Sequence, residues 1–279
     1  MSRNLIARIA VAIVFIPLIL WISYQGGTPF FAMILLFALI AMTEFLRAER
    51  IGLSHWQFWL AQAAVVLSMY LHFRAHDDPA LPAVMLTLPV VAAFFLLSGA
   101  ILGMGRQTPQ ELFTRHTHLV WGVVYIGLLY PQVLHLGLGV GSFNGGDTML
   151  FVFGLLWVGD TAAMGIGSWL GKRKLAPTVS PNKTVAGFTG GITGALAIGI
   201  VMYAWKFNFV PVHHVLLIAV GASVFGQLGD LVESMWKRSI GIKDSSHLIP
   251  GHGGMLDRFD SLLFAAPFVH AYLWWLTRG

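Results

Sequence analysis

Acidic residues occur at helical spacing in two places near the end of the 279-residue sequence. Asp230 and Glu233 are three positions apart, and the same spacing separates Asp257 from Asp260. On a helix such pairs share a face, and two carboxylates on one turn supply the oxygen ligands that a divalent cation prefers. Acidic residues at a helix start also complement the helix dipole, and Glu233 has a purely structural explanation in an ion pair with Lys237. Both kinds of explanation stay open at this point.

A glycine-dense segment, Pro250–Gly254, lies immediately before the second acidic pair. Glycines permit tight turns and let backbone N–H groups approach phosphate oxygens, although a plain interhelical turn has the same composition. Upstream are the cations Lys237, Arg238 and Lys243, which either neutralise phosphates or only mark a cytoplasmic loop. Phosphoryl or nucleotidyl transfer requires cations, a close-fitting loop and carboxylates that hold a metal. We therefore predict a phosphate and metal site within Ser234–Asp260.

Two other places carry polar groups that fit such a site. In the polar loop Gly171–Thr184, the side chains of Ser180, Lys183 and Thr184 can contact phosphate, and a helix cap is the alternative explanation. Asp160 lies within an apolar run, where an ionisable group is costly and usually faces a cavity or a partner. We expect Asp160 to line a polar cavity. The sequence has no Gly-x-x-x-x-Gly-Lys-Ser/Thr phosphate loop and no His-Glu-x-x-His zinc motif.

The elements that position these residues are predicted to be membrane-spanning helices. Hydrophobic residues make up 57% of the chain and charged residues 10%, against about a quarter charged in a soluble domain. Cysteine is absent, which excludes disulfides, thiolate metal sites and a cysteine nucleophile. Apolar runs of spanning length predict an all-α integral membrane protein with about nine transmembrane helices, the first of them retained rather than cleaved as a signal peptide. The predicted spans are 5–24, 29–46, 55–73, 82–103, 118–138, 148–170, 185–205, 212–233 and 259–277.

These spans separate the basic residues sharply. All 17 lysines and arginines except Arg74, Lys206 and Arg278 fall on one side, and the positive-inside rule places that side and the N-terminus in the cytoplasm. The formal charge of +5 is thereby explained without nucleic acid. We divide the chain into an N-terminal membrane region, 1–145, with about five helices and no confident motif, and a catalytic membrane region, 146–279, with about four helices. The active site is predicted at the cytoplasmic ends of the C-terminal helices.

The C-terminal pattern resembles the signature of the phosphatidate cytidylyltransferase family, also called CDP-diacylglycerol synthases. The matching residues are Ser234, Lys237, Arg238, Lys243, Asp244, Ser246, Ile249, Pro250, His252, Gly253, Gly254, Asp257, Arg258 and Asp260. Upstream, the resemblance continues at Gly229–Ser234, at Asp160–Ala163 and at Ser180–Thr184. The chain departs from the family at Ala186, where glutamate is usual, and at Met164, where an aromatic residue is frequent.

The resemblance implies a Mg²⁺-dependent enzyme of phospholipid biosynthesis in the cell (inner) membrane, which converts CTP and phosphatidate to CDP-diacylglycerol and diphosphate. Asp230 and Asp257 are then metal ligands, with Asp260 as a third carboxylate, and Lys237 and Lys243 complete the catalytic set. The implied substrate-binding residues are Asp160, Ser180, Lys183, Thr184, Arg238, His252, Gly253, Gly254 and Arg258. A second, monovalent cation and a homodimer are left open, as are the acyl-chain preference and the effect of Ala186.

Three alternatives belong to other classes. A CTP-dependent lipid or polyprenol kinase would transfer a phosphate rather than CMP. A CDP-alcohol phosphotransferase needs glycine where this chain has Ser261, and later aspartates that are absent. An ion-coupled transporter would use Asp160 and Asp230 as ion sites, but the inverted repeats frequent in transporters are not evident in the sequence.

Overall fold

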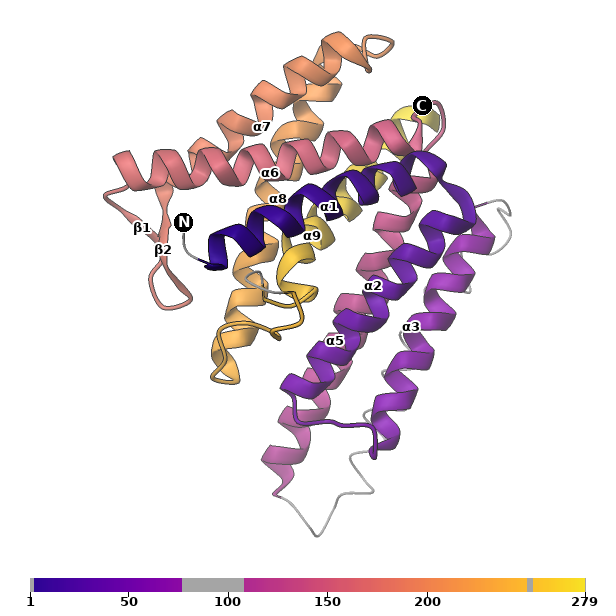
Figure 1. Cartoon of the computed structure of the whole chain (residues 1–279), viewed down its shortest axis with the longest axis vertical. Helices are drawn as coiled ribbons and strands as arrows, with labels where there is room; N and C mark the ends of the chain where they lie inside the picture. Colours follow the sequence, from indigo (N-terminus) through magenta and orange to yellow (C-terminus); the bar gives the residue numbers. More distant parts are fainter. Residues whose placement is uncertain (1–2, 77–107, 250–252, 279) are drawn as a thin grey trace. The chain divides into compact units, whose positions relative to one another are not determined.

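The computed structural model describes residues 3–76, 108–249 and 253–278, with side chains from Ile13 onward. Within these residues the chain forms eight helices and one small hairpin (Figure 1). The elements are α1 (Arg3–Gln25), α2 (Gly27–Ala48), α3 (Trp56–Ala75), α5 (Pro109–Leu138), α6 (Gly145–Leu170), β1 (Lys174–Ala176), β2 (Ser180–Thr184), α7 (Val185–Trp205), α8 (Val212–Ser239) and α9 (Leu256–Arg278). The predicted span 82–103 lies outside the described residues.

Five of the described helices, α2, α5, α6, α7 and α8, are long and apolar enough to cross a membrane. The part of α1 from Ile13 to Gln25 is apolar but shorter. The prediction of a helical integral membrane protein is confirmed at this level, whereas the count of nine spans and their orientation remain predictions.

The chain divides into two compact units that are not continuous in sequence. The first contains the residues up to Val11 together with Gly27–His135 and Asp244–Arg258. The second contains Ala12–Gly26, Leu136–Lys243 and the residues from Phe259 to the C-terminus. The predicted phosphate segment, Ser234–Asp260, therefore contributes residues to both units, and each unit is described by itself below.

In the first unit, α2, α3 and α5 pack along one another. The ring of Phe45 on α2 lies against α5 at Gly122, where a Cβ atom would come within 2.1 Å of that ring. On α3, the hydroxyl of Ser68 donates a 2.6 Å hydrogen bond to the carbonyl of Gly127 on α5. These contacts allow the helix backbones to approach closely, as is typical where small residues lie at membrane-helix interfaces.

Helix α5 begins nine residues before its predicted span because a capping box precedes the apolar run. The Thr108 hydroxyl accepts from the Glu111 N–H at 3.3 Å, and the Glu111 carboxylate accepts from the Thr108 N–H at 3.0 Å. Pro109 occupies the first helical position, where its missing N–H costs nothing. Hydropathy alone does not register such a polar helix start.

In the second unit, glycines on α7 pack directly against side chains of α6. A Cβ atom at Gly190 would lie 2.8 Å from Ile166, and one at Gly194 would lie 2.7 Å from Ala162, both on α6. Helices α6 and α7 lie side by side as a result (Figure 1). The glycines of α7 thus permit close helix packing, and this packing occurs within one chain.

The segment predicted as the loop Gly171–Thr184 instead contains a β-hairpin. Strands β1 and β2 pair antiparallel, with Lys174 opposite Thr184 and Ala176 opposite Ser180. The Thr184 hydroxyl then caps α7 by accepting a 3.0 Å hydrogen bond from the Gly187 N–H. The hairpin therefore leads into α7 and projects the residues of β2 from a defined position.

Candidate functional site

The second unit contains a polar cavity of about 580 Å³. Helices α6, α7 and α8 and the hairpin form its walls. It brings together four of the residues predicted from the sequence, namely Asp160, Lys183, Thr184 and Asp230. They come from three separate stretches of the chain that the fold of this unit brings to one cavity. Their roles in binding or catalysis remain predictions.

An ion pair joins the hairpin to α8 within this cavity. The ammonium group of Lys183 lies 2.5 Å from the carboxylate of Asp230, and the two side chains are 25% and 35% exposed. Ser234, one turn further along α8, donates to Asp230 at 3.3 Å. Asp230 is thus oriented by contacts from Lys183 and Ser234 and lines the cavity together with Lys183.

Glu233 and Lys237 form the helical ion pair that their spacing predicts. Their charged groups are 3.3 Å apart, and the Glu233 side chain is fully buried. Removing one partner of a buried pair leaves an uncompensated charge, which costs far more than the pair contributes. The pair accounts for Glu233 structurally, in agreement with the explanation from the sequence.

A third carboxylate reaches this part of α8 from α9. The side chain of Asp260 lies beside Asp230, Glu233 and Lys237. The helices approach closely here because residue 229 is glycine, and a Cβ atom at Gly229 would lie 2.6 Å from the Asp260 carbonyl oxygen. Three carboxylates, two on α8 and one on α9, form a charged cluster with Lys237.

In the first unit, Asp257 organises the segment that precedes α9. One of its carboxylate oxygens, Oδ2, accepts hydrogen bonds from the Ser245 N–H at 2.8 Å, the Ser245 hydroxyl at 2.9 Å and the Gly254 N–H at 2.8 Å. The residue is only 9% exposed. Part of the role of Asp257 is therefore to fold the segment that carries the family motif.

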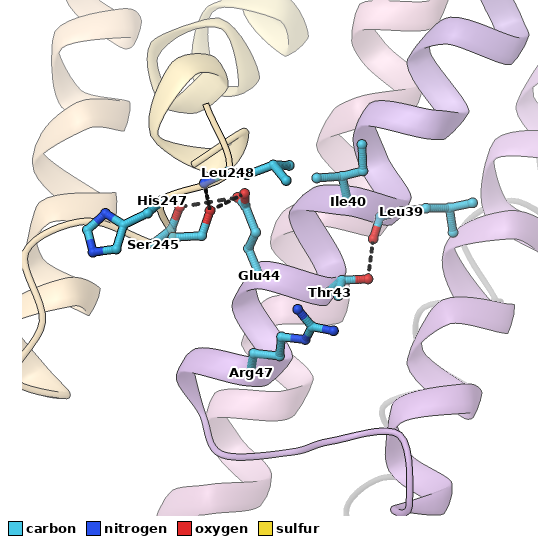
Figure 2. A pocket seen from close by; sticks show the side chains of 9 residues that line it. Leu39, Ile40, Thr43, Glu44, Arg47, Ser245, His247 and Leu248 are labelled. Carbon is cyan, nitrogen blue, oxygen red and sulfur yellow. Dashed lines mark hydrogen bonds between the residues drawn. The ribbon is translucent and has the colours of Figure 1, made fainter. Parts of the chain in front are cut away.

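Glu44 is a residue of this region that sequence reasoning missed. Its Oε1 accepts from the Ser246 hydroxyl at 2.6 Å and the Met255 N–H at 2.9 Å. Its Oε2 accepts from the Ser245 hydroxyl at 3.2 Å and the Leu256 N–H at 2.9 Å. Figure 2 shows this carboxylate on α2 facing the segment around Ser245. Glu44 thereby caps the first N–H groups of α9, which have no partner within their own helix.

The same contacts explain a glycine of the motif. A Cβ atom at Gly254 would lie 2.0 Å from the Ser245 hydroxyl and 2.6 Å from Oε2 of Glu44. Glu44 could have been found from the sequence, because it is an acidic residue inside the apolar run 29–46, and such residues are by default functional candidates. Its partners are about 200 positions away, and no spacing rule identifies them.

The remaining predicted residues have diverse surroundings. Arg238 donates to the Ile242 carbonyl at 3.0 Å, whereas Lys243 and Arg258 are exposed. Gly253 has a φ of +82°, which favours glycine. Ser180 lies in β2 opposite Ala176, and His252 lies outside the described residues. Their predicted contacts with substrates remain predictions.

The metal assignment also remains a prediction. Among residues 3–76, 108–249 and 253–278, no group of three or more acidic or histidine side chains is arranged to hold a metal ion. Mg²⁺, however, is commonly held by only one or two carboxylates together with substrate phosphates. The adjacent carboxylates of Asp230 and Asp260 fit that mode of binding.

Similarity to known proteins covers nearly the whole chain. A family model described as "Cytidylyltransferase family" matches residues 6–276. The phosphatidate cytidylyltransferase of Staphylococcus haemolyticus is 35% identical over 271 residues, which are 97% of this chain and 98% of that protein. Proteins of the same name from Staphylococcus epidermidis and Staphylococcus aureus are 33% and 34% identical, with the same coverage. This chain belongs to the cytidylyltransferase family.

Proposed function

We propose that this protein is a phosphatidate cytidylyltransferase, which converts CTP and phosphatidate to CDP-diacylglycerol and diphosphate. The observation that carries the proposal is the similarity to enzymes of that name over 97% of the chain. The apolar helices that a lipid-modifying membrane enzyme requires are present. The motif residues Lys183 and Asp230 also meet at one cavity.

The chemistry explains why cations and carboxylates occur together. A phosphate oxygen of phosphatidate attacks the α-phosphorus of CTP, a new P–O bond forms, and the bond between the α- and β-phosphates breaks as diphosphate leaves. Both reactants are strongly anionic, so positioned cations are needed to bring them together. We assign Lys183 to phosphate binding, because it lines the cavity and its ammonium group pairs with Asp230 there. Lys237, Arg238, Lys243 and Arg258 are proposed to neutralise further phosphate charge.

We propose that Mg²⁺ is bound by Asp230 and Asp260 of the second unit. The sequence predicts Asp257 as a principal ligand beside Asp230, and that assignment stays a prediction. The ion would supply positive charge to the phosphates and to the departing diphosphate. The protein's own contribution is to hold the two carboxylates at adjacent positions on α8 and α9. The Lys183–Asp230 ion pair keeps one of them oriented.

We further propose that the N-terminus and the phosphate site lie on the cytoplasmic side of the cell membrane, where CTP is available. The distribution of basic residues supports this orientation. Since the chain contains no cysteine, a single cysteine at the exposed residue Asn182 is a clean reporter. Labelling only in inverted vesicles supports the orientation, and labelling only from the outside of intact cells contradicts it.

Labelled CTP tests the proposed reaction and separates it from the kinase alternative. Purified protein in mixed micelles with phosphatidate and Mg²⁺ should move an α-phosphate label from CTP into the lipid and release diphosphate. A CTP-dependent kinase would instead transfer the γ-phosphate label and release CDP. Failure to incorporate the α-label, in a folded and pure preparation, would refute the proposed function. Chelation of Mg²⁺ should abolish incorporation reversibly.

A further inference from the structure

A second cavity, of about 490 Å³, lies in the first unit and shares no lining residue with the cavity around Asp230. One wall is the C-terminal half of α2, and the other is the segment 245–248 that precedes α9 (Figure 2). The lining residues are Leu39, Ile40, Thr43, Glu44 and Arg47 from α2, and Ser245, Ser246, His247 and Leu248 from the segment. Its volume is within the range of about 300–1,000 Å³ that is typical of small-molecule sites.

The walls of this cavity are held in place by hydrogen bonds. Glu44 ties Ser245 and Ser246 to α2. Thr43 donates to the Leu39 carbonyl at 2.8 Å and accepts from the Gln62 side chain at 2.7 Å. Four donors within the wall surround the carboxylate of Glu44, so its oxygens are used to hold the wall together.

The lining has two chemical characters. Leu39, Ile40 and Leu248 form an apolar part, and Leu248 is 56% exposed although it is a large hydrophobic residue. Arg47 and His247 are exposed and add hydrogen-bond donors, and Arg47 adds positive charge. The planar guanidinium of arginine matches phosphate oxygens. An apolar wall beside a phosphate-binding cation fits an amphiphile with an anionic head better than it fits a nucleotide.

The position along α2 points to the same class of ligand. Helix α2 is one of the helices able to span a membrane, and Arg47 lies in its last turn. Basic residues at such positions lie at the level of lipid headgroups. A cavity that contains Arg47 near the helix end and Leu39 two turns deeper therefore follows the polarity of a phospholipid from its headgroup to its acyl chain.

We propose that this cavity binds phosphatidate, with the lipid phosphate at Arg47 and His247 and the first part of an acyl chain along Leu39, Ile40 and Leu248. The proposal rests on the proposed function, because it identifies where the lipid substrate enters the reaction. Arg47 becomes a determinant of lipid affinity, although it lies outside the motif that identifies the family.

The test compares Arg47→Gln with Arg50→Gln. Arg50 is a matched control because it is exposed, three residues further along, and does not line the cavity. We expect Arg47→Gln to raise the KM for phosphatidate, measured as its mole fraction in mixed micelles, by about tenfold or more, while the KM for CTP stays within twofold of wild type. Arg50→Gln should leave both constants unchanged. Equal effects of the two substitutions would indicate general surface charge and would overturn the assignment.

A binding measurement without turnover complements the kinetics. Phosphatidate with a photoreactive group near the start of one acyl chain should cross-link to peptides that contain residues 39–47 or 245–248 when CTP is absent. Ile40→Trp, which fills the apolar part, should reduce that cross-linking at least fivefold in protein that elutes as a single folded species. An unchanged cross-linking yield in Ile40→Trp, or an unchanged phosphatidate KM in Arg47→Gln, would overturn the lipid site. In both cases CMP transfer by the wild type would leave the proposed function intact.

Discussion

Replacing Glu44 by alanine should release the segment that precedes α9. The carboxylate accepts four hydrogen bonds, two from serine hydroxyls and two from the backbone N–H groups of Met255 and Leu256. The hydroxyls can turn toward other acceptors, and Ser245 already has Asp257 within 2.9 Å. The two N–H groups cannot turn, so the substitution leaves two donors without a partner.

The magnitude follows from those two donors. A buried donor left without a partner costs about 1–3 kcal/mol, so two cost about 2–6 kcal/mol. We expect a value near the lower end, about 3 kcal/mol, because the adjacent cavity lets water reach the segment. At about 1.4 kcal/mol for each factor of ten, local opening becomes more frequent by on the order of 100-fold.

Hydrogen exchange measured by mass spectrometry reads this opening directly. In Glu44→Ala the amides of Met255 and Leu256 should exchange on the order of 100-fold faster than in wild type, with a smaller change elsewhere. Glu44→Gln keeps one accepting oxygen and loses one backbone hydrogen bond, so about tenfold is expected. The activity of both variants should fall in the same order.

Glu49 is the matched control for this experiment. It is an acidic residue one position beyond the end of α2, and it pairs with His118 at 3.1 Å instead of with the segment 245–256. Glu49→Gln should leave the exchange of Met255 and Leu256 unchanged. If Glu44→Ala folds and these two amides keep their wild-type exchange rates, Glu44 does not hold the segment and the reasoning is wrong.

Three further substitutions test individual contacts. Gly254→Ala places a Cβ atom 2.0 Å from the Ser245 hydroxyl, and overpacking of this kind costs about 1–3 kcal/mol. We therefore expect a lower melting temperature and at least tenfold less activity. A neutral result would show that the segment adapts freely. Lys183→Met removes a partly exposed ion pair with Asp230, so the free energy of unfolding should change by less than about 1 kcal/mol. The kcat/KM for CTP should fall at least tenfold. A parallel loss of stability and of kcat/KM would point to a structural role. Asp257→Asn keeps an oxygen that can accept hydrogen bonds from the Ser245 and Gly254 N–H groups. Expression and melting temperature should therefore be retained, while turnover should be abolished. Normal turnover would remove Asp257 from the metal assignment.

The helices of this protein could be predicted well from sequence because hydropathy is a local property. The predicted span 185–205 coincides with α7, and 212–233 begins where α8 begins. The errors are at polar helix ends. Helix α8 continues to Ser239 because its ionisable residues find partners, among them Lys183 for Asp230 and Lys237 for Glu233. The hairpin was missed because its strands are only three and five residues long, which is too short for a clear alternating pattern.

The sequence by itself determined the family and the membrane character, and it supplied a set of candidate site residues, because motif spacing and composition are properties of the linear chain. Tertiary structure decided which of those residues meet. Lys183 reaches Asp230 only because the hairpin and α8 line one cavity, and Glu44 reaches Met255 and Leu256 across more than 200 positions. The physical reason is that a buried carboxylate needs donors from wherever the fold brings them, and the identity of those donors is a property of packing and not of local sequence.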